Sequence, residues 1–333
     1  MVYIYKKPIG NGNYYYLRAS ERKKGKILAK DIAYLGSSIE EVKSNLEKLP
    51  KLKDQIRKSY KKIHSFLESN HFLEKAQALK LKQDSFLKGK TEEVEACRLH
   101  YYDVFNRLDG LTKKDAFKTY VIEFAYNTAS IEGNTINLDE ARDLLNEGIT
   151  PKGKTLREIY DLQNTEKVFF ELLSSPNKEI THELIISIHD KLLENIDERR
   201  GYRTTDILVM RSNFDATPGK YVKTDMDLLL KWYYGHKNKL RPLVLASVFH
   251  HKFEKIHPFM DGNGRTGRMI MNYILIKSNW PPTIIHKKNR NEYLDAMREA
   301  DLSDTWKLDG KHYASLISYG TDEFIDTYWS IFL

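Results

Sequence analysis

Two helical segments joined by a glycine-rich loop constrain the fold of this chain more than any other feature. Residues 246–256 carry apolar side chains at helical spacing, and the step from His257 to proline disfavours continuation of that helix. A second helical pattern starts near residue 266 and runs to about residue 277. The sequence therefore predicts a helix, a short loop and a second helix, with the loop lying against the N-terminal end of the second helix.

The loop has the composition of an anion-binding site. Its two glycines, Gly262 and Gly264, let backbone N–H groups turn toward one point, and the start of the next helix adds unpaired donors. Arg265 and Arg268 lie three residues apart at that start, so both guanidinium groups can reach the same anion. We expect this anion to be a polyphosphate.

An acidic residue and a histidine complete the set. Asp261 would repel a polyphosphate unless a divalent cation lay between them, and Mg²⁺ is commonly held by one or two carboxylates together with substrate phosphates. His257 can take a proton near neutral pH, as a general base acting on a hydroxyl must. Together these residues indicate transfer of a phosphorus-containing group from a nucleotide to an alcohol.

The same residues resemble the signature of a known family. The run from His257 to Arg268, HPFMDGNGRTGR, agrees with the Fic signature HPFx(D/E)GNGRxxR at every specified position. An ordered run of this length is far more specific than a lone glycine-rich motif. The preceding helix resembles the family pattern AxxxHxxFxxIHPF through Ala246, His250, Phe253 and Ile256.

The resemblance implies a protein adenylyltransferase, an enzyme that moves AMP from ATP to a Ser, Thr or Tyr hydroxyl of a target protein. His257 would deprotonate that hydroxyl, and Asp261 would hold Mg²⁺ or Mn²⁺. Arg265 and Arg268 would neutralise charge at the β- and γ-phosphates. Positioning and electrostatics, rather than a covalent enzyme intermediate, would supply most of the acceleration.

The resemblance also assigns roles to the remaining loop residues. Phe259 would be buried and would anchor the loop. The residues expected to cradle the phosphate oxygens are Gly262, Asn263 and Gly264.

A second motif lies upstream, at the end of a helix expected over about 114–130. The run TASIEGN, from Thr128 to Asn134, resembles the inhibitory motif (S/T)xxxE(G/N) of class II Fic proteins, whose N-terminal inhibitory helix would here span about 114–133. Glu132 would pair with Arg268 and occupy the space that the γ-phosphate needs. The alternative is an ordinary solvated glutamate at a helix end. With the inhibitory role, the wild-type chain would be an AMP transferase held largely inactive.

A β-hairpin is expected on the helical body at about 204–224. An apolar run starting at Ile207 is followed by a polar segment with proline and glycine, and then by Tyr221 and Val222. This hairpin resembles the family's flap, which binds an extended segment of the target by strand addition. The predicted contact residues are Leu208, Val209 and Met210. An ordinary structural hairpin is the alternative.

The segment 293–301 resembles the last helix of the family's adenine pocket. Tyr293 and Asp301 are therefore candidate nucleotide contacts, although relatives often carry Asn at the position of Asp301. A core aromatic residue and a surface acid are the alternative interpretation. These two residues are compatible with more than one nucleotide base.

The whole chain is predicted to be mainly α, a Fic-type helical bundle with a β-hairpin flap. Residues 1–36 contain three short β-branched or aromatic runs and should form a small β-meander. Residues 37–91 form a Lys-rich helical segment, which opens on the capping-box residues Ser38 and Glu41. The Fic domain should occupy residues 92–333.

Composition indicates the cellular compartment in which the protein is expected. Cys97 is the only cysteine, which excludes an internal disulfide and a Cys-rich zinc site and fits a reducing compartment. No apolar run is long enough to span a membrane, and the first ten residues lack the pattern of a signal peptide. A cytoplasmic protein is the expectation. The net charge of +8 could serve ATP or nucleic acid, or simply solubility.

The sequence is also compatible with two other functions. The same residues could remove AMP from a modified protein, with Glu132 orienting a water and His257 protonating the leaving hydroxyl. A second alternative is a non-enzymatic regulator or nucleic-acid-binding protein with a vestigial Fic fold, which the basic N-terminal region keeps open. The expected partners are ATP and a target protein, with a homodimer as a further option.

Overall fold

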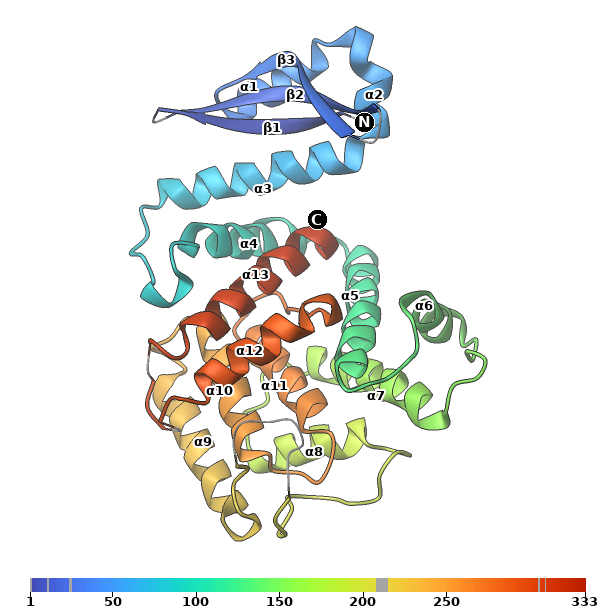
Figure 1. Cartoon of the computed structure of the whole chain (residues 1–333), viewed down its shortest axis with the longest axis vertical. Coiled ribbons are helices and arrows are strands. Elements are labelled where there is room, and N and C mark those ends of the chain that lie inside the picture. The colour runs from blue at the N-terminus through green and yellow to red at the C-terminus, as the bar shows by residue number, and fades with distance from the viewer. Residues whose placement is uncertain (1, 11, 24–25, 208–214, 305, 309) are drawn as a thin grey trace.

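A three-stranded sheet lies at one end of the molecule and helices form the rest, as the computed structural model shows (Figure 1). The described residues are 2–10, 12–23, 26–207, 215–304, 306–308 and 310–333. The mainly helical fold with a small N-terminal meander confirms the predicted fold class.

The sheet is an antiparallel meander with the order β1-β2-β3. Its strands, β1 Val2–Ile9, β2 Gly12–Lys23 and β3 Lys26–Gly36, are longer than the apolar runs that predicted them. One face buries Val2, Ile4, Tyr15, Leu17 and Leu35 against the following helices. Alternation of side chains along each strand sends the neighbouring residues to the opposite face.

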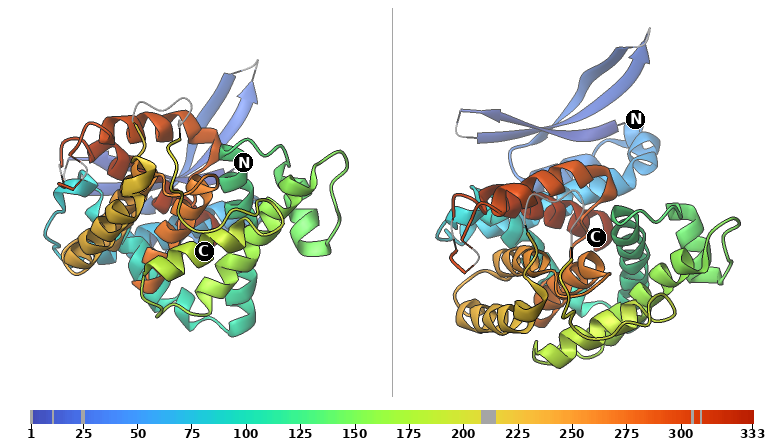
Figure 2. Two further views of the ribbon diagram at one scale, coloured as in Figure 1. Left: turned by 90° about the horizontal axis from the view of Figure 1, so that it is seen from below. Right: turned by 60° about the horizontal axis from the view of Figure 1, so that its bottom comes forward.

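The segment after the sheet begins with a capped helix. α1 (Ile39–Glu47) starts at Ser38, whose hydroxyl accepts a bond from the Glu41 N–H, while the Glu41 carboxylate accepts one from the N–H of Ser37. The expected helical stretch that follows is interrupted: η1 (Pro50–Leu52), α2 (Lys53–Lys58) and α3 (Tyr60–Ala78) follow one another. α3 lies between the sheet and the helical body in two views (Figures 1 and 2).

The helical body is built from ten α-helices in the described part of the chain. They are α4 Thr91–Asp103, α5 Gly110–Ile131, α6 Leu138–Glu147, α7 Leu156–Leu173, α8 His182–Leu192, α9 Val222–His236, α10 Pro242–Ile256, α11 Asn263–Lys277, α12 Arg290–Ala300 and α13 Ala314–Ile331. Short 3₁₀ turns connect several of them: η2 Ser85–Leu87, η3 Phe105–Arg107, η4 Gly219–Tyr221 and η5 Lys287–Asn289.

α10 and α11 form the centre of this body. Most residues of both helices are buried around their whole circumference, which is typical of a helix enclosed by others rather than one lying on a surface. They pack against each other and against α8, α9 and α13. The loop that joins them is thereby held at a fixed place. Across the described residues, no helix is both long enough and apolar enough to cross a membrane.

The predicted hairpin at 204–224 differs from the structure at its second strand. Tyr221 ends the 3₁₀ turn η4, and Val222 begins α9. Val222 is fully buried, and α9 carries the apolar residues Met226, Leu229 and Leu230 at helical spacing. The apolar pair was therefore the start of an amphipathic helix and not a strand. The three predicted flap contacts, Leu208, Val209 and Met210, lie outside the described residues.

Candidate active site

His257 lies at the mouth of the loop, directly after the last turn of α10. Its backbone has φ +53°, a left-handed conformation that ends the helix and turns the chain toward the glycines. The Nδ1 atom is 3.3 Å from the carbonyl oxygen of Glu254. A carbonyl can only accept, so Nδ1 carries the proton of the neutral ring and Nε2 is left with the lone pair.

The protonation of His257 suits a general base. Burial lowers the pKa of His257 below the ordinary value of 6.5, with the Arg203 guanidinium adding to the shift and the Glu254 carbonyl opposing it. The ring is therefore neutral at pH 7. The relative solvent exposure of the His257 side chain is 20%, which leaves the ring accessible to a substrate.

The side chain of Asn263 fixes the shape of the loop. It accepts a bond from the N–H of Phe259 and donates one to the carbonyl of the same residue, both 2.9 Å long. Phe259 is fully buried, as predicted, and stacks on His189 with ring centroids 3.7 Å apart. Asn263 was expected to cradle phosphate, but its amide is committed to the loop. Its backbone, at the first turn of α11, can still face an anion.

Arg268 is buried and held by the end of α5. Its Nη2 atom is 2.7 Å from a carboxylate oxygen of Glu132, and its Nε donates to the Thr128 hydroxyl at 2.7 Å. Nη2 also donates to the Thr128 carbonyl at 3.1 Å. Burial alone would raise the pKa of Glu132, but the Arg268 guanidinium outweighs it and holds that pKa below its ordinary value. The two residues predicted to pair are in contact as a charged pair.

Gly264 permits this contact because it lacks a side chain. A Cβ atom built on Gly264 would lie 2.0 Å from the Glu132 carboxylate and 2.9 Å from Nη1 of Arg268. Any side chain there would drive Glu132 away from the start of α11. Gly264 therefore permits the contact between Glu132 and Arg268 as well as the expected approach of a phosphate.

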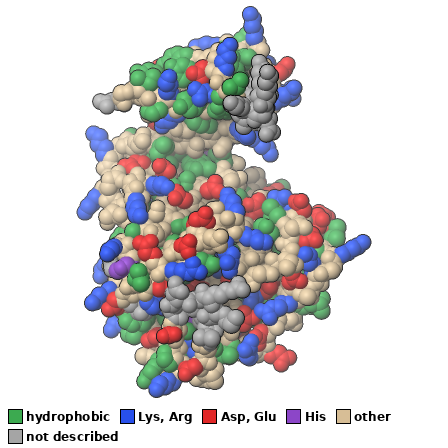
Figure 3. Space-filling model, in the orientation of Figure 1, with side chains coloured by type: hydrophobic (Ala, Val, Ile, Leu, Met, Phe, Trp, Pro, Cys, Tyr) green, Lys and Arg blue, Asp and Glu red, His purple; other side chains and the backbone are tan. Residues whose placement is uncertain are grey.

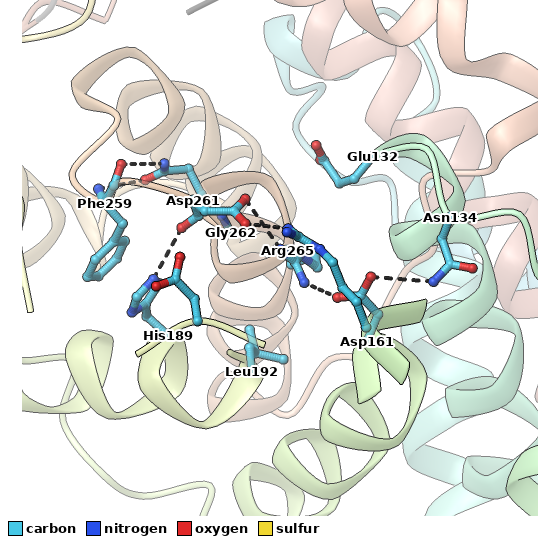
Figure 4. A network of polar contacts seen from close by, with 12 residues as sticks. Glu132, Asn134, Asp161, His189, Leu192, Phe259, Asp261, Gly262 and Arg265 are labelled. Atoms are coloured by element: carbon cyan, nitrogen blue, oxygen red, sulfur yellow. Dashed lines mark hydrogen bonds and ion pairs between the residues drawn. The ribbon is translucent and has the colours of Figure 1, made fainter. Parts of the chain in front are cut away.

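Arg265 and Asp261 belong to a second charged network, shown in Figure 4. Arg265 is ion-paired with Asp161 of α7, and its Nη2 is 3.5 Å from Asp261. Asp261 is also ion-paired with Arg157. Burial would raise the pKa of Asp261, but Arg265 and Arg157 outweigh it and lower that pKa.

This network reaches the predicted inhibitory motif, Thr128 to Asn134. Asn134, at the end of that motif, donates to Asp161 at 3.4 Å, so both arginines of the loop are tied to the chain around Glu132 (Figure 4). Asp161 and Arg157 were not identified from the sequence. They lie about a hundred residues before the loop, and no local pattern marks them as its partners.

The chain alone offers one carboxylate at the predicted metal position. Within the described residues there is no cluster of three or more His, Cys, Asp or Glu side chains that could hold a metal ion. Asp261 is therefore suited to Mg²⁺ that arrives with nucleotide phosphates, because this ion usually keeps water and phosphate oxygens as its other ligands.

Arg203 joins the loop to the base of the predicted flap. Its buried guanidinium donates to the carbonyls of His257 at 2.8 Å and Ile256 at 3.2 Å. The same group donates to the carbonyls of Thr205 at 2.8 Å and Thr217 at 2.5 Å. The Arg203 guanidinium thus donates to four carbonyls, two at the start of the loop and two at the base of the predicted flap.

Glu254 lies behind His257 and was not identified from the sequence. One carboxylate oxygen is 4.0 Å from Nδ1 of His257, and the other is 3.9 Å from Nδ1 of His250. Burial raises the pKa of Glu254 to about 8. A protonated carboxyl therefore sits beside the candidate base at neutral pH.

The two candidate adenine contacts have partners inside the fold. The Tyr293 hydroxyl is 2.7 Å from Nε2 of His250, and the Tyr293 side chain is buried. Asp301 is 2.9 Å from Nε2 of His251. These bonds favour the structural interpretation of both residues. A contact with the adenine base stays a prediction.

Fold and site together define a Fic domain: a central helix, the signature loop and a helix whose N-terminal arginines face it. Residues 179–275 match the Fic/DOC family. The chain is 32% identical over 211 residues to protein adenylyltransferase fic-1 of Caenorhabditis elegans, covering 61% of this chain and 41% of that protein. It is 31% identical over 225 residues to protein adenylyltransferase Fic of Culex quinquefasciatus, covering 65% and 43%.

Solved structures share the fold. A Fic domain containing signaling protein from Bacteroides thetaiotaomicron has a TM-score of 0.64 at 22% identity, covering 69% of this chain and 93% of that one. A variant of Fic-1 from C. elegans has a TM-score of 0.59 at 26% identity, covering 74% and 71%. Residues 179–275 are thus a Fic/DOC domain, and the chain is related to proteins named protein adenylyltransferase Fic. It spans about two fifths of the length of the relatives named protein adenylyltransferase.

Proposed function

We propose that this chain is a protein adenylyltransferase that moves AMP from ATP to a Ser, Thr or Tyr hydroxyl of a target protein. The observation that carries the proposal is the loop between α10 and α11. It has a neutral His257 at its mouth and, at the start of α11, two buried arginines, each held by a carboxylate from another element. Such arginines are suited to receive a triphosphate.

His257 performs the proton transfer. The target hydroxyl attacks the α-phosphorus of ATP while its proton passes to Nε2 of His257. The bond from the α-phosphorus to the bridging oxygen breaks, and diphosphate leaves. Nδ1–H stays directed at the Glu254 carbonyl, which keeps the ring in the required tautomer.

The start of α11 binds the leaving diphosphate. Arg265 and Arg268 stabilise its negative charge, and the first backbone N–H groups of α11 add donors. Asp261 would hold Mg²⁺, which offsets the phosphate charge when bound. Loading would have to move Arg157 away from that carboxylate.

Glu132 holds the activity low in this proposal. Its carboxylate engages Arg268 at 2.7 Å, and a γ-phosphate on Arg268 would have to replace it. Removal of the Glu132 side chain leaves Arg268 buried and without its anionic partner, a state that favours an incoming phosphate.

The test compares variants in a labelling experiment. Purified wild type, Glu132→Gly, His257→Ala and the double variant receive ATP labelled at the α-phosphate, with and without cell lysate. Glu132→Gly should label itself and lysate proteins at least about tenfold more than wild type, which corresponds to about 1.4 kcal/mol of relieved competition. His257→Ala should abolish labelling in either background.

A matched control is available in the chain. Glu147 is also a helix-terminal glutamate followed by glycine, and it is exposed. Glu147→Gly should leave labelling at the wild-type level. Labelling that survives the loss of His257, or that comes from γ-labelled ATP instead, would contradict AMP transfer. Release of AMP from previously labelled proteins by wild type, without added diphosphate, would favour hydrolytic removal of AMP at the same site.

A further inference from the structure

The positive charge of the chain is concentrated at its N-terminal end. Residues 1–62 contain 16 Lys or Arg and 6 Asp or Glu, a net charge of +10. Residues 63–333 contain 38 basic and 40 acidic residues, a net charge of −2. The excess charge of +8 therefore belongs to the sheet and the short helices that follow it. Solubility alone does not require such an asymmetry, because it would be served by charge spread over the whole surface.

The strand register places aromatic and basic side chains together on the outer face of the sheet. Tyr5 of β1 pairs with Tyr16 of β2, which pairs with Tyr34 of β3. In the next row, Tyr3 pairs with Arg18. Lys7 pairs with Tyr14 on the other side. Directly paired residues of antiparallel strands point to the same face.

These side chains contact one another and stay accessible. The rings of Tyr16 and Tyr34 have centroids 5.4 Å apart, and the relative solvent exposure of Tyr34 is 53%. The Arg18 guanidinium lies 3.6 Å from the centre of the Tyr5 ring and is ion-paired with Asp31. The result is a layer of aromatic rings with fixed positions rather than a set of separate surface residues.

The outer face lies opposite the face that the helices cover. α1, α2 and α3 contact the sheet, and the apolar residues between them and the sheet are those of its inner face. In the space-filling view, Lys and Arg side chains project around this end of the molecule (Figure 3). The face therefore offers rings for stacking in a positive electrostatic field.

We propose that the outer face of the N-terminal sheet, defined here by Tyr3, Tyr5, Tyr14, Tyr16, Arg18 and Tyr34, binds single-stranded nucleic acid. Unpaired bases can stack on the exposed ring of Tyr34 and on the half-buried rings beside it, whereas bases in a duplex are stacked on one another and present only their edges. The charge of +10 attracts the phosphate backbone regardless of sequence. This binding does not depend on AMP transfer, since the sheet is separate from the loop at His257.

The test measures binding by the full chain with fluorescein-labelled oligonucleotides in an anisotropy titration. The probes are a 20-nucleotide oligo-dT, an oligo-rU of the same length and a duplex of the same length, at several salt concentrations. Both single strands should bind at least about tenfold more tightly than the duplex. Tyr34→Leu should weaken binding about 5- to 150-fold, the range for loss of one base–aromatic stack.

Two matched variants keep the test decisive. Tyr34→Phe retains the ring and should bind like wild type, which separates stacking from the hydroxyl. Tyr102→Ala removes a tyrosine that is 54% exposed on α4 and should have no effect. Circular dichroism on each variant shows whether the fold is kept.

Two results would overturn the proposal. One is absence of single-strand binding near physiological salt. The other is binding that is equal for single strand, duplex and heparin and insensitive to Tyr34→Leu, since that pattern shows polyanion attraction without stacking.

Discussion

At the scale of single residues, the site is governed by how burial sets protonation. His250, Glu254 and His257 lie along the last two turns of α10 and at its end, and burial favours the neutral form of each. The pKa of each histidine is lowered and that of the glutamic acid is raised. A neutral acid and a neutral base therefore lie side by side next to the charged pair of Arg268 and Glu132.

The protonation of His257 predicts the acid limb of the pH–rate profile. A base must be neutral to accept a proton, and the pKa of His257 lies below 6.5. AMP transfer by the Glu132→Gly variant, measured at saturating ATP and Mg²⁺, should therefore be flat near pH 7 and fall only below pH 6.5. An acid limb centred at or above pH 7 would show that His257 is not the titrating base.

Glu254 predicts how stability depends on pH. The folded chain keeps the Glu254 proton up to about pH 8, whereas an unfolded chain loses it near the ordinary value of 4.5. The contribution to stability is thus full below about pH 4.5 and is lost as pH rises toward 8, by roughly a few kcal/mol. Glu254→Gln should lose less stability than wild type between pH 5 and 8.5 in thermal unfolding. Parallel curves for the two proteins would contradict this.

Residues within one motif could be predicted from the sequence, and their partners from elsewhere could not. The loop order identified His257, Asp261 and the two arginines, and the pairing of Arg268 with Glu132 followed from the resemblance. Asp161 and Arg203 were missed as loop partners because their roles depend on where α7 and the segment before α9 lie in space. A lone Asp on an amphipathic helix carries no sign of such a partner.

At the scale of elements, the loop is a rigid insert between two buried helices. Its conformation depends on the pair of bonds between Asn263 and the backbone of Phe259, and on the stacking of Phe259 against His189. The helices α10 and α11 fix the two ends of the loop, and the hydrogen bonds of Asn263 fix the residues between those ends.

The helices themselves were largely predicted from helical spacing. The predicted second strand at Tyr221 and Val222 was wrong because a run of two apolar residues is too short to distinguish a strand from the start of an amphipathic helix.

Asn263→Ala should loosen this insert. It removes two buried hydrogen bonds and leaves an N–H and a carbonyl of Phe259 without partners, at a cost of about 2–4 kcal/mol. AMP transfer should fall sharply even in the folded variant, because His257 and the start of α11 lose their fixed separation. Denaturant unfolding and labelling measure the two effects. The control is Asn291→Ala on the exposed side of α12, which should change neither.

At the scale of the whole molecule, the N-terminal sheet and the helical body differ in composition, and both pack on α3. The N-terminal sheet packs on α3, and α3 packs on α4 of the Fic domain. Phe72, Ala76 and Ala96 form the small buried cluster between α3 and α4, and Phe72 lies edge-on against His100 at 4.9 Å. The sheet is thus fixed to the helical body by a packed interface, and the two parts should unfold together.

Phe72→Ala should uncouple the two bodies. Truncation of a buried phenylalanine costs about 3–5 kcal/mol, and here the loss falls on the α3–α4 interface. Wild type should unfold in one calorimetric transition and the variant in two, while His257-dependent labelling is retained. Phe66→Ala, which affects the core beneath the sheet and leaves the α3–α4 cluster intact, is the matched control and should lower the temperature of the single transition without splitting it. A single transition in Phe72→Ala would contradict the coupling role of this interface.

The separation of charge between the N-terminal residues and the rest of the chain gives the molecule a large electric dipole moment. A protein with such a dipole rotates in the field of a polyanion before the two surfaces touch, so encounters begin with the sheet already facing the polymer. The rate of association should consequently depend on ionic strength more steeply than the net charge of +8 alone would require. Because α3 packs on both the sheet and α4, the orientation of the helical body relative to any such polymer is then also set before a specific contact has formed.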